Sequence, residues 1–219
     1  MAAMTISDGW PATAPARATA RLTDDAAPPV LHPLLAERWS PATFDPSYEV
    51  TASEVDAILE AARWAPSAGN SQPWAFITAR REDPIHARLV RRLTGSSAAW
   101  APSASLLVAN LCHRYVEDTD WEYSEFAHYD LGQAVAHMTF QAQALGLYAR
   151  QFRAFHRTAL AAEFAVPNHW EVTTMTAFGR RPPGRRDSPV STPGGERPQR
   201  RRRSAREIRW MALDGNRRD

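Results

Sequence analysis

The stretch Ala65–Trp74, APSAGNSQPW, carries the residue types best suited to holding a planar heteroaromatic ligand. Its content of Pro, Ser, Gly and Asn is typical of a loop between a helix and a strand. Gly69 can adopt a positive φ and let the backbone approach a ligand, while Asn70 and Gln72 offer amide donors and acceptors. On residue types alone, a polar connection with no chemical role is the commoner explanation of such a stretch.

A second group of candidates lies upstream, in the segment Arg38–Phe44, RWSPATF. Arg38 provides a two-pronged donor and Ser40 a short hydroxyl donor, a combination that suits a phosphate group. Taken alone, this pair is equally compatible with a solvated arginine at a helix end. The presence of the APSAGNSQPW loop in the same chain favours the phosphate-binding interpretation of this pair.

Regular elements must position these residues. Thr51 and Glu54 form a capping box that predicts a helix over Thr51–Trp64, and the loop then leads into a short buried strand, Ala75–Ala79. Asp83 and Pro84 predict the start of a helix that turns Ile85, Leu89 and Leu93 inward. Further along, the patterns predict strands over Ser103–Cys112, Leu147–Phe152 and Val172–Phe178, and helices over Phe126–Leu145, which Gly146 ends, and Thr158–Phe164.

Length and composition predict one domain with two tails in this chain of 219 residues. We expect a disordered tail over 1–29, a ligand-binding domain over 30–180, and an Arg- and Pro-rich arm over 181–219 that completes the domain or a dimer. All 26 basic residues are Arg, which excludes Schiff-base chemistry by lysine and suits phosphate. From Arg180 onward, 13 Arg stand against 5 acidic residues, a net charge of +8.

Other classes of site find little support. The single cysteine, Cys112, excludes an intrachain disulfide, and its apolar surroundings predict a buried, inert thiol. His113, His128, His137 and His156 show no metal-binding spacing, and no serine hydrolase motif occurs. The absence of a long apolar run and of a secretory signal pattern favours a cytoplasmic protein without a membrane span.

The segment Pro66–Trp74, PSAGNSQPW, resembles the PS-[SA]-x-N-x-QPW signature of the nitroreductase family. That resemblance implies that FMN contacts the loop, through Pro66, Ser67, Ala68, Asn70 and Gln72. RWSPATF is similar to the family's R-x-S-x-[RK]-x-F motif, which implies that Arg38 and Ser40 hold the phosphate and ribityl end of FMN. Ala42 stands where the family has a basic residue near the flavin ring.

Two more segments resemble the family. Gly146–Phe155 is similar to its GL…GF segment, which implies that Gln151, Arg153 and Ala154 lie near the flavin, with Ala154 at the usual glycine position. Arg153 could bulk the pocket or attract an anionic phosphate. Arg201 and Arg203 match basic residues of a C-terminal arm that completes the FMN phosphate site. Asp130 and Gly132 match the family's D-x-G, for which we expect a packing or capping role.

The resemblance implies an α+β, nitroreductase-like fold, with a mixed, mostly antiparallel sheet flanked by helices, in a homodimer. It implies an oxidoreductase that moves hydride from NADH or NADPH through FMN to a nitroaromatic, quinone or similar small-molecule acceptor by a ping-pong mechanism. No side chain need act as a catalytic acid or base. The departures at Ala42, Arg153 and Ala154 leave a second possibility, a flavin-binding or interaction protein without turnover. The run Arg200–Arg203 leaves a third, nucleic-acid binding, which no recognition motif supports.

Overall fold

Four strands form one sheet in the computed structural model, which describes residues 31–182 and 202–210. The strand order is β1-β2-β4-β3, and each of the three pairings is antiparallel. The strands are β1 (Trp74–Arg80), β2 (Leu106–His113), β3 (Tyr148–Phe152) and β4 (Trp170–Gly179). Every residue of β2 up to Cys112 is buried, so this strand is covered on both faces as its apolar sequence predicts.

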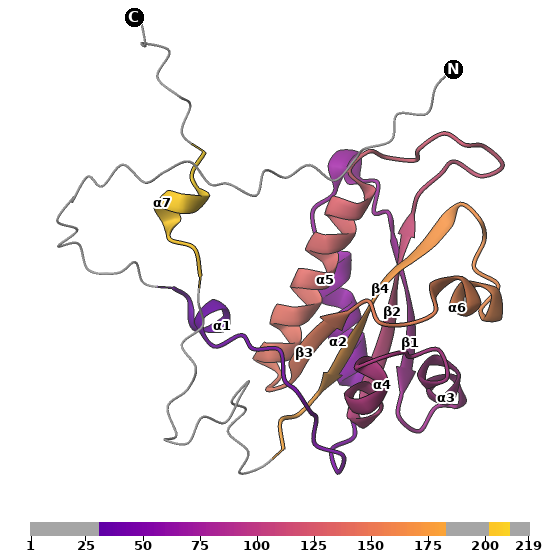
Figure 1. Cartoon of the computed structure of the whole chain (residues 1–219). Helices are drawn as coiled ribbons and strands as arrows, with labels where there is room; N and C mark the ends of the chain where they lie inside the picture. The colour runs from indigo at the N-terminus through magenta and orange to yellow at the C-terminus, as the bar shows by residue number, and fades with distance from the viewer. Residues whose placement is uncertain (1–30, 183–201, 211–219) are drawn as a thin grey trace, which may run out of the picture. The chain divides into compact units, whose positions relative to one another are not determined.

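Helices cover both faces of the sheet (Figure 1). The long helix α5 packs against α2 and against the sheet, while α3 and α6 pack on the other side. The helices are α1 (Pro33–Ala36), α2 (Ala52–Arg63), α3 (Pro84–Val90), α4 (Ser97–Trp100), α5 (Ala127–Ala144), α6 (Arg157–Glu163) and α7 (Ala205–Ile208), with 3-10 turns η1 (Ala68–Asn70) and η2 (Ala101–Ser103). The predicted α+β class is confirmed.

The alternation of side chains along β2 produces two hydrophobic cores. Leu107 and Ala109 face the core that α3, α4 and α6 complete. Leu106 and Val108 face the opposite core, where they meet Ile58 of α2 and residues of α5. The sheet is therefore a central layer with a hydrophobic core on each face, which is why the sequence of β2 is a nearly continuous hydrophobic run.

The ends of the two helices beside the candidate site follow local sequence rules. The Thr51 side chain accepts from the Glu54 N–H at 3.2 Å, and the Glu54 carboxylate accepts from the Thr51 N–H at 2.8 Å, which confirms the capping box. Gly146 ends α5 with φ +76°, and the Leu147 N–H donates to the Ala142 carbonyl at 2.8 Å. These bonds form a Schellman motif that turns the chain directly into β3.

The prediction for α3 is wrong in two respects. Ile85 is exposed, and His86 takes the buried position together with Leu89. Asp83 does not cap the helix with its side chain; its carboxylate instead accepts from the Arg80 N–H at 2.8 Å. The helix is two turns long, and its buried positions, His86 and Leu89, are three residues apart, which leaves Ile85 at the edge of the buried face.

Three interactions fix the segment that leads from Arg38 into α2. The ring of Phe44 is buried against Gly179 of β4, where a Cβ would lie 2.9 Å from the Phe44 Cδ1. Arg150 of β3 donates to the Pro41 carbonyl at 3.1 Å. Arg81 donates to the carbonyls of Asp45, Pro46 and Tyr48 and pairs with the Glu49 carboxylate. The Arg38–Ser40 pair therefore begins a segment that is bound firmly to the sheet.

The tails lie largely outside the described residues, so the predicted division at residues 29 and 180 stays a prediction. Of the arm, the structure describes residues 181–182 and residues 202–210, and the latter include α7. Within the described parts of the chain, no helix is long and apolar enough to span a bilayer.

Candidate functional site

Arg38, Ser40 and Gln151 line one cavity of about 360 Å³. The N-terminal segment supplies Arg38 and Ser40, β3 supplies Ala149 and Gln151, and α5 supplies the rest of the wall, Ala136, Thr139 and Phe140. The Arg38 Nη1 donates to the Ser40 Oγ at 3.2 Å, so the two predicted phosphate ligands are in direct contact. Arg38 is the one charged side chain among these lining residues, which makes the cavity electropositive.

The Gln151 side chain is held toward α5. Its Nε2 donates to the Thr139 Oγ1 at 3.2 Å, and the Thr139 hydroxyl in turn donates to the Val135 carbonyl at 2.8 Å. Thr139 is buried, so its bond to the Val135 carbonyl is shielded from water, whereas Gln151 is exposed. This chain of hydrogen bonds fixes the Gln151 amide at the cavity wall. Thr139 could not be singled out from the sequence, where it is one polar residue within an apolar helix pattern.

The loop between α2 and β1 has an unusual backbone. Gly69, Asn70 and Gln72 all have positive φ, at +58°, +54° and +47°. Non-glycine residues adopt this region rarely, so the surrounding bonds must hold them there. The Ser67 Oγ accepts from the Gln72 N–H at 3.0 Å, and the Gln72 Nε2 donates to the Asn70 Oδ1 at 3.2 Å. The two amide side chains are thus paired on one exposed edge of the loop.

Asp130 anchors this loop to the first turn of α5. Its side chain is buried, and its Oδ2 accepts from the Ala68 N–H at 3.0 Å while its Oδ1 accepts from the Gln133 Nε2 at 3.3 Å. We expected a packing or capping role for Asp130, and the structure shows a specific hydrogen bond between its side chain and the loop backbone. At Gly132, a Cβ would meet no atom within 4 Å, so packing does not require glycine there.

An aromatic stack holds the loop from the other side. The His113 ring lies between Tyr123 and Trp170, at centroid distances of 3.8 and 4.6 Å. The Tyr123 hydroxyl donates to the Ser71 carbonyl at 3.1 Å, and the His113 N–H donates to the Pro73 carbonyl at 3.0 Å. Burial lowers the pKa of His113, and the charge of His169 lowers it further, so the stacked ring favours its neutral form.

The remaining predicted residues do not line the Arg38 cavity. The five loop residues, from Pro66 to Gln72, lie near the N-terminal end of α5, where Asp130 binds the loop. Thr139, which lines the cavity, follows Asp130 by nine residues, roughly 13 Å at the rise of a helix. Arg153 follows the end of β3 and donates from Nε to the Thr173 carbonyl at 2.8 Å. Ala154 does not have a positive φ, so alanine fits the backbone at this position.

Of the two arm residues, Arg201 lies outside the described part of the chain, and Arg203 is exposed at the start of α7, donating to the Glu207 carbonyl. Ala42 is exposed. Arg150, which the sequence patterns did not single out, stacks on the Trp100 ring at 4.0 Å and bonds to the Pro41 carbonyl beside Ala42. Within the described residues, no cluster of three metal-ligating side chains occurs.

Comparison with known proteins agrees with this geometry. Residues 35–104, which include the Arg38–Phe44 segment and the whole loop, match the model of the nitroreductase family. Over these residues the chain resembles the nitroreductase family. An oxygen-insensitive NAD(P)H nitroreductase of Salmonella typhimurium is 42% identical over 60 residues, and an oxygen-insensitive NADPH nitroreductase of Helicobacter pylori is 44% identical over 50 residues.

These nitroreductase matches are local. They span 27% and 23% of this chain and 27% and 24% of the two relatives, so about a quarter of each relative's length is matched. Likeness in fold extends further. A crystal structure of an oxidoreductase containing FMN is 27% identical, with a TM-score of 0.65 over 74% of this chain and 82% of that one. A nitroreductase family protein of Clostridium difficile is 22% identical, with a TM-score of 0.64 over 82% of this chain and 96% of that one.

Proposed function

We propose that this chain is an FMN-dependent oxidoreductase that takes hydride from NADH or NADPH and passes electrons to a nitroaromatic, quinone or similar acceptor in a ping-pong mechanism. The observation that carries the proposal is the cavity that brings the Arg38–Ser40 pair together with Gln151, from two distant parts of the sequence. The nitroreductase names of the relatives and the FMN-containing oxidoreductase of similar fold support it.

The donors at this cavity fit FMN. A guanidinium and a hydroxyl in mutual contact suit a phosphate, and no carboxylate lines the cavity to repel it. The volume of about 360 Å³ lies within the range of small-molecule pockets, about 300–1,000 Å³. Arg38 and Ser40 would hold the phosphate, and Gln151 would face the ribityl chain. The loop residues Asn70 and Gln72 would bond to the polar edge of the ring.

When bound, FMN supplies the two-electron chemistry, and the protein supplies position and electrostatics. The chain's contribution begins with the strained loop, whose positive-φ backbone presents amide groups at fixed positions. Asp130 and Tyr123 restrain that loop from opposite sides, so a ring edge meets a preformed set of donors and acceptors. No side chain acts as a proton donor or acceptor in this proposal.

The visible absorption spectrum of the purified full-length protein tests the proposal. We expect a bound-flavin spectrum that bleaches when NADH or NADPH is added without oxygen and that returns when a nitroaromatic acceptor follows. Arg38→Gln should release flavin at concentrations where the wild-type protein retains it, because a charge-assisted contact with the phosphate is lost. A protein that takes up no added FMN would refute the proposal.

We also infer that the working unit is a homodimer. A groove of about 570 Å³ runs between α2 and α5, with Leu34, Trp64 and Phe140 among its apolar lining residues. The Trp64 side chain is 71% exposed, and large exposed apolar surfaces of this kind mark interaction sites. On α7 and just after it, Ile208 and Trp210 are also exposed. A second copy of the chain would cover such surfaces in a two-fold arrangement.

A flavin-binding protein without turnover remains the second candidate, and the exposed Ala42 favours it. Ala42→Arg discriminates between the two. If flavin retention and NADPH-driven bleaching rise sharply in the variant, the natural site is weakened at this contact. If neither changes, another group has replaced that contact. Arg150 is the candidate, because its guanidinium donates to the carbonyl of the adjacent Pro41.

A further inference from the structure

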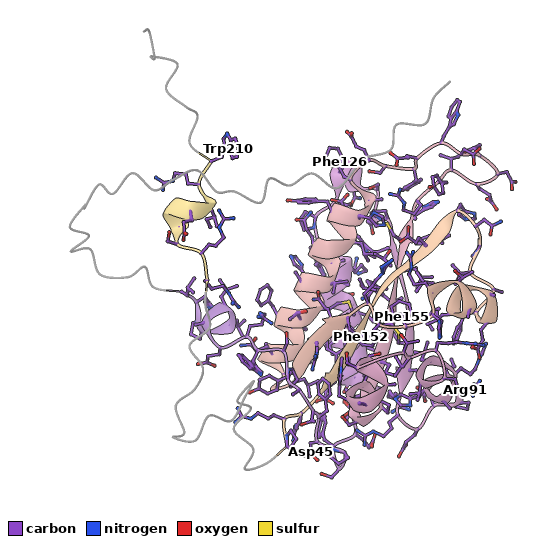
Figure 2. All side chains as sticks on the ribbon, in the orientation of Figure 1. Asp45, Arg91, Phe126, Phe152, Phe155 and Trp210 are labelled. Carbon is purple, nitrogen blue, oxygen red and sulfur yellow. The ribbon has the colours of Figure 1, made fainter. Side chains whose placement is uncertain are left out.

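A second cavity, of about 430 Å³, lies past the end of β3. It is distinct from the cavity that holds Arg38. Its lining residues are Arg153, Phe155, His156, Arg157, Thr158 and Ala159. Phe155 is packed edge-on against Phe152 of β3, with ring centroids 6.4 Å apart, and Figure 2 shows the two side by side. The cavity floor is therefore fixed to the sheet, although the cavity itself is open to solvent.

The lining of this cavity is cationic. Arg153 uses its Nε for the bond of 2.8 Å to the Thr173 carbonyl, which orients the guanidinium; among the described residues, no hydrogen bond occupies its two terminal nitrogens. Arg157 pairs through Nη1 with the Glu171 carboxylate at 2.8 Å. Arg157 shares the Glu171 carboxylate with two other groups, because the Glu171 Oε2 also lies 3.8 Å from the Arg114 Nε and 3.7 Å from the His128 Nε2. No carboxylate belongs to the lining itself.

The neighbouring surface adds to the positive charge. Glu163 of α6 pairs with three arginines of the α3 region, Arg88, Arg91 and Arg92, at 3.2, 3.1 and 2.6 Å. Together with Arg153 and Arg157, five guanidinium groups stand against two carboxylates, Glu163 and Glu171, which leaves a surplus of three positive charges. A concave site with such a surplus attracts anions and raises their local concentration.

The cavity also lies close to the candidate cofactor site along the chain. Arg153 follows Gln151 by two residues, about 7 Å at the rise of an extended strand. A small molecule whose anionic group is held by Arg153 and Arg157 could therefore extend to the candidate cofactor site. Arginine suits phosphate and carboxylate alike, because its planar fork can donate two parallel hydrogen bonds to either.

We propose that the cavity between Arg153 and Arg157 binds the phosphate or carboxylate of a small anionic substrate. This inference names the chemical class of the substrates and, in that respect, rests on the proposed oxidoreductase function. Two sources carry this chemistry: the 2′-phosphate of NADPH and a carboxylate on the electron acceptor.

A titration of the full-length protein tests anion binding directly. Amide chemical shifts of residues 153–159 are followed by NMR while inorganic phosphate, and separately adenosine 2′,5′-bisphosphate, is added. We expect saturable shifts, and an apparent Kd about tenfold weaker in Arg153→Gln and in Arg157→Gln, since each removes a charge-assisted contact. Arg91→Gln is the matched control: it removes one exposed guanidinium from the same surface, outside the cavity. It should weaken the Kd by less than about twofold, because it lowers the surrounding positive charge without removing a direct contact.

Steady-state kinetics identify the source. If the 2′-phosphate occupies the cavity, Arg157→Gln lowers the ratio of kcat/KM for NADPH to that for NADH by about tenfold, mainly through KM. If an acceptor carboxylate occupies it, the ratio for 4-nitrobenzoate against nitrobenzene falls instead. The ratios are unaffected by a general loss of activity, so a merely structural role of Arg157 would not move them.

The inference is overturned if phosphate causes no saturable shift at residues 153–159, or if Arg91→Gln weakens binding as much as Arg157→Gln does. Failure of the proposed function is separately visible. A protein that takes up no FMN, yet binds phosphate in an Arg157-dependent way, refutes the oxidoreductase and retains the anion site. A flavin enzyme without these shifts refutes the anion site alone.

Discussion

At the scale of single residues, Asp130 shows how one carboxylate can fix the loop between α2 and β1. It is buried in the first turn of α5 and accepts from the Ala68 N–H in the middle of the loop. A buried acceptor that serves a backbone donor on another element couples the two elements directly. Glu125, five residues earlier on the same chain, is exposed and has no such bond among the described residues.

Asp130→Ala should lower the free energy of unfolding by about 1–3 kcal/mol, because the Ala68 N–H loses its partner in a partly buried position. Urea unfolding monitored by tryptophan fluorescence measures the loss. Glu125→Ala is the control and should change the free energy by less than about 0.5 kcal/mol. Equal effects of the two substitutions would contradict the anchoring role. Faster amide exchange at Ala68 in Asp130→Ala would place the effect in the loop.

A second residue-scale prediction concerns His86, which is buried and whose Nε2 has no hydrogen-bond partner among the described residues. Burial lowers the pKa of His86 below its ordinary 6.5, and the positive charge of Arg81 lowers it further. Below about pH 6.5 the unfolded chain therefore binds a proton at this position that the folded chain does not. The free energy of unfolding must fall as the pH drops through this range.

We expect wild-type stability to decrease between pH 7 and pH 5, and His86→Leu to flatten that decrease by up to about 1.4 kcal/mol per pH unit. Urea unfolding at half-unit pH steps gives the slope. His156→Gln, which removes an exposed imidazole, is the matched control. An equal slope in wild type and His86→Leu would show that His86 binds protons equally well in the folded and the unfolded chain.

At the scale of elements, the contact between Phe44 and β4 fixes the segment that carries Arg38 and Ser40. The Phe44 ring occupies the space that a Cβ at Gly179 would need, with three ring and side-chain carbons within 3.3 Å of that position. The absence of a side chain at Gly179 thus lets the segment lie flat on the end of the sheet. The packing of the whole segment, rather than either residue alone, sets where Arg38 and Ser40 lie.

Gly179→Ala should destabilise the fold by about 1–3 kcal/mol, because Phe44 is buried and its ring must shift. Gly132→Ala in α5 is the control, because its added Cβ would meet no atom within 4 Å. Alanine also favours the helix over glycine by about 1 kcal/mol. Thermal unfolding of both variants should therefore show opposite shifts in Tm. A neutral Gly179→Ala would mean that the Phe44 segment adapts without cost.

At the scale of the whole molecule, the groove between α2 and α5 is the surface that a dimer would cover. Trp64 lies at its edge, with its Nε1 donating to the Glu60 carboxylate at 2.8 Å while most of the ring remains exposed. Apolar surface of this size is costly to leave in water, by about 25 cal/mol per Å². A measurement of the oligomeric state therefore tests both the dimer and the role of the groove in it.

Sedimentation equilibrium of the wild-type protein should give twice the chain mass of 24.4 kDa. Trp64→Glu should give the single-chain mass, because a charge placed in the groove resists burial. Trp121→Glu is the matched control, since that ring is 78% exposed on the segment before α5, away from the groove. A wild-type protein that sediments at the single-chain mass would refute the dimer.

The sequence by itself determined the elements and the identity of most candidate residues, because these depend on local chemistry. The capping box at Thr51, the left-handed turn at Gly146 and the covered strand β2 all follow from short-range rules. Proximity between distant residues follows no such rule. The cavity of Arg38 and Gln151 and the bond from Ala68 to Asp130 were decided by tertiary packing, since each joins segments whose meeting depends on the whole sheet.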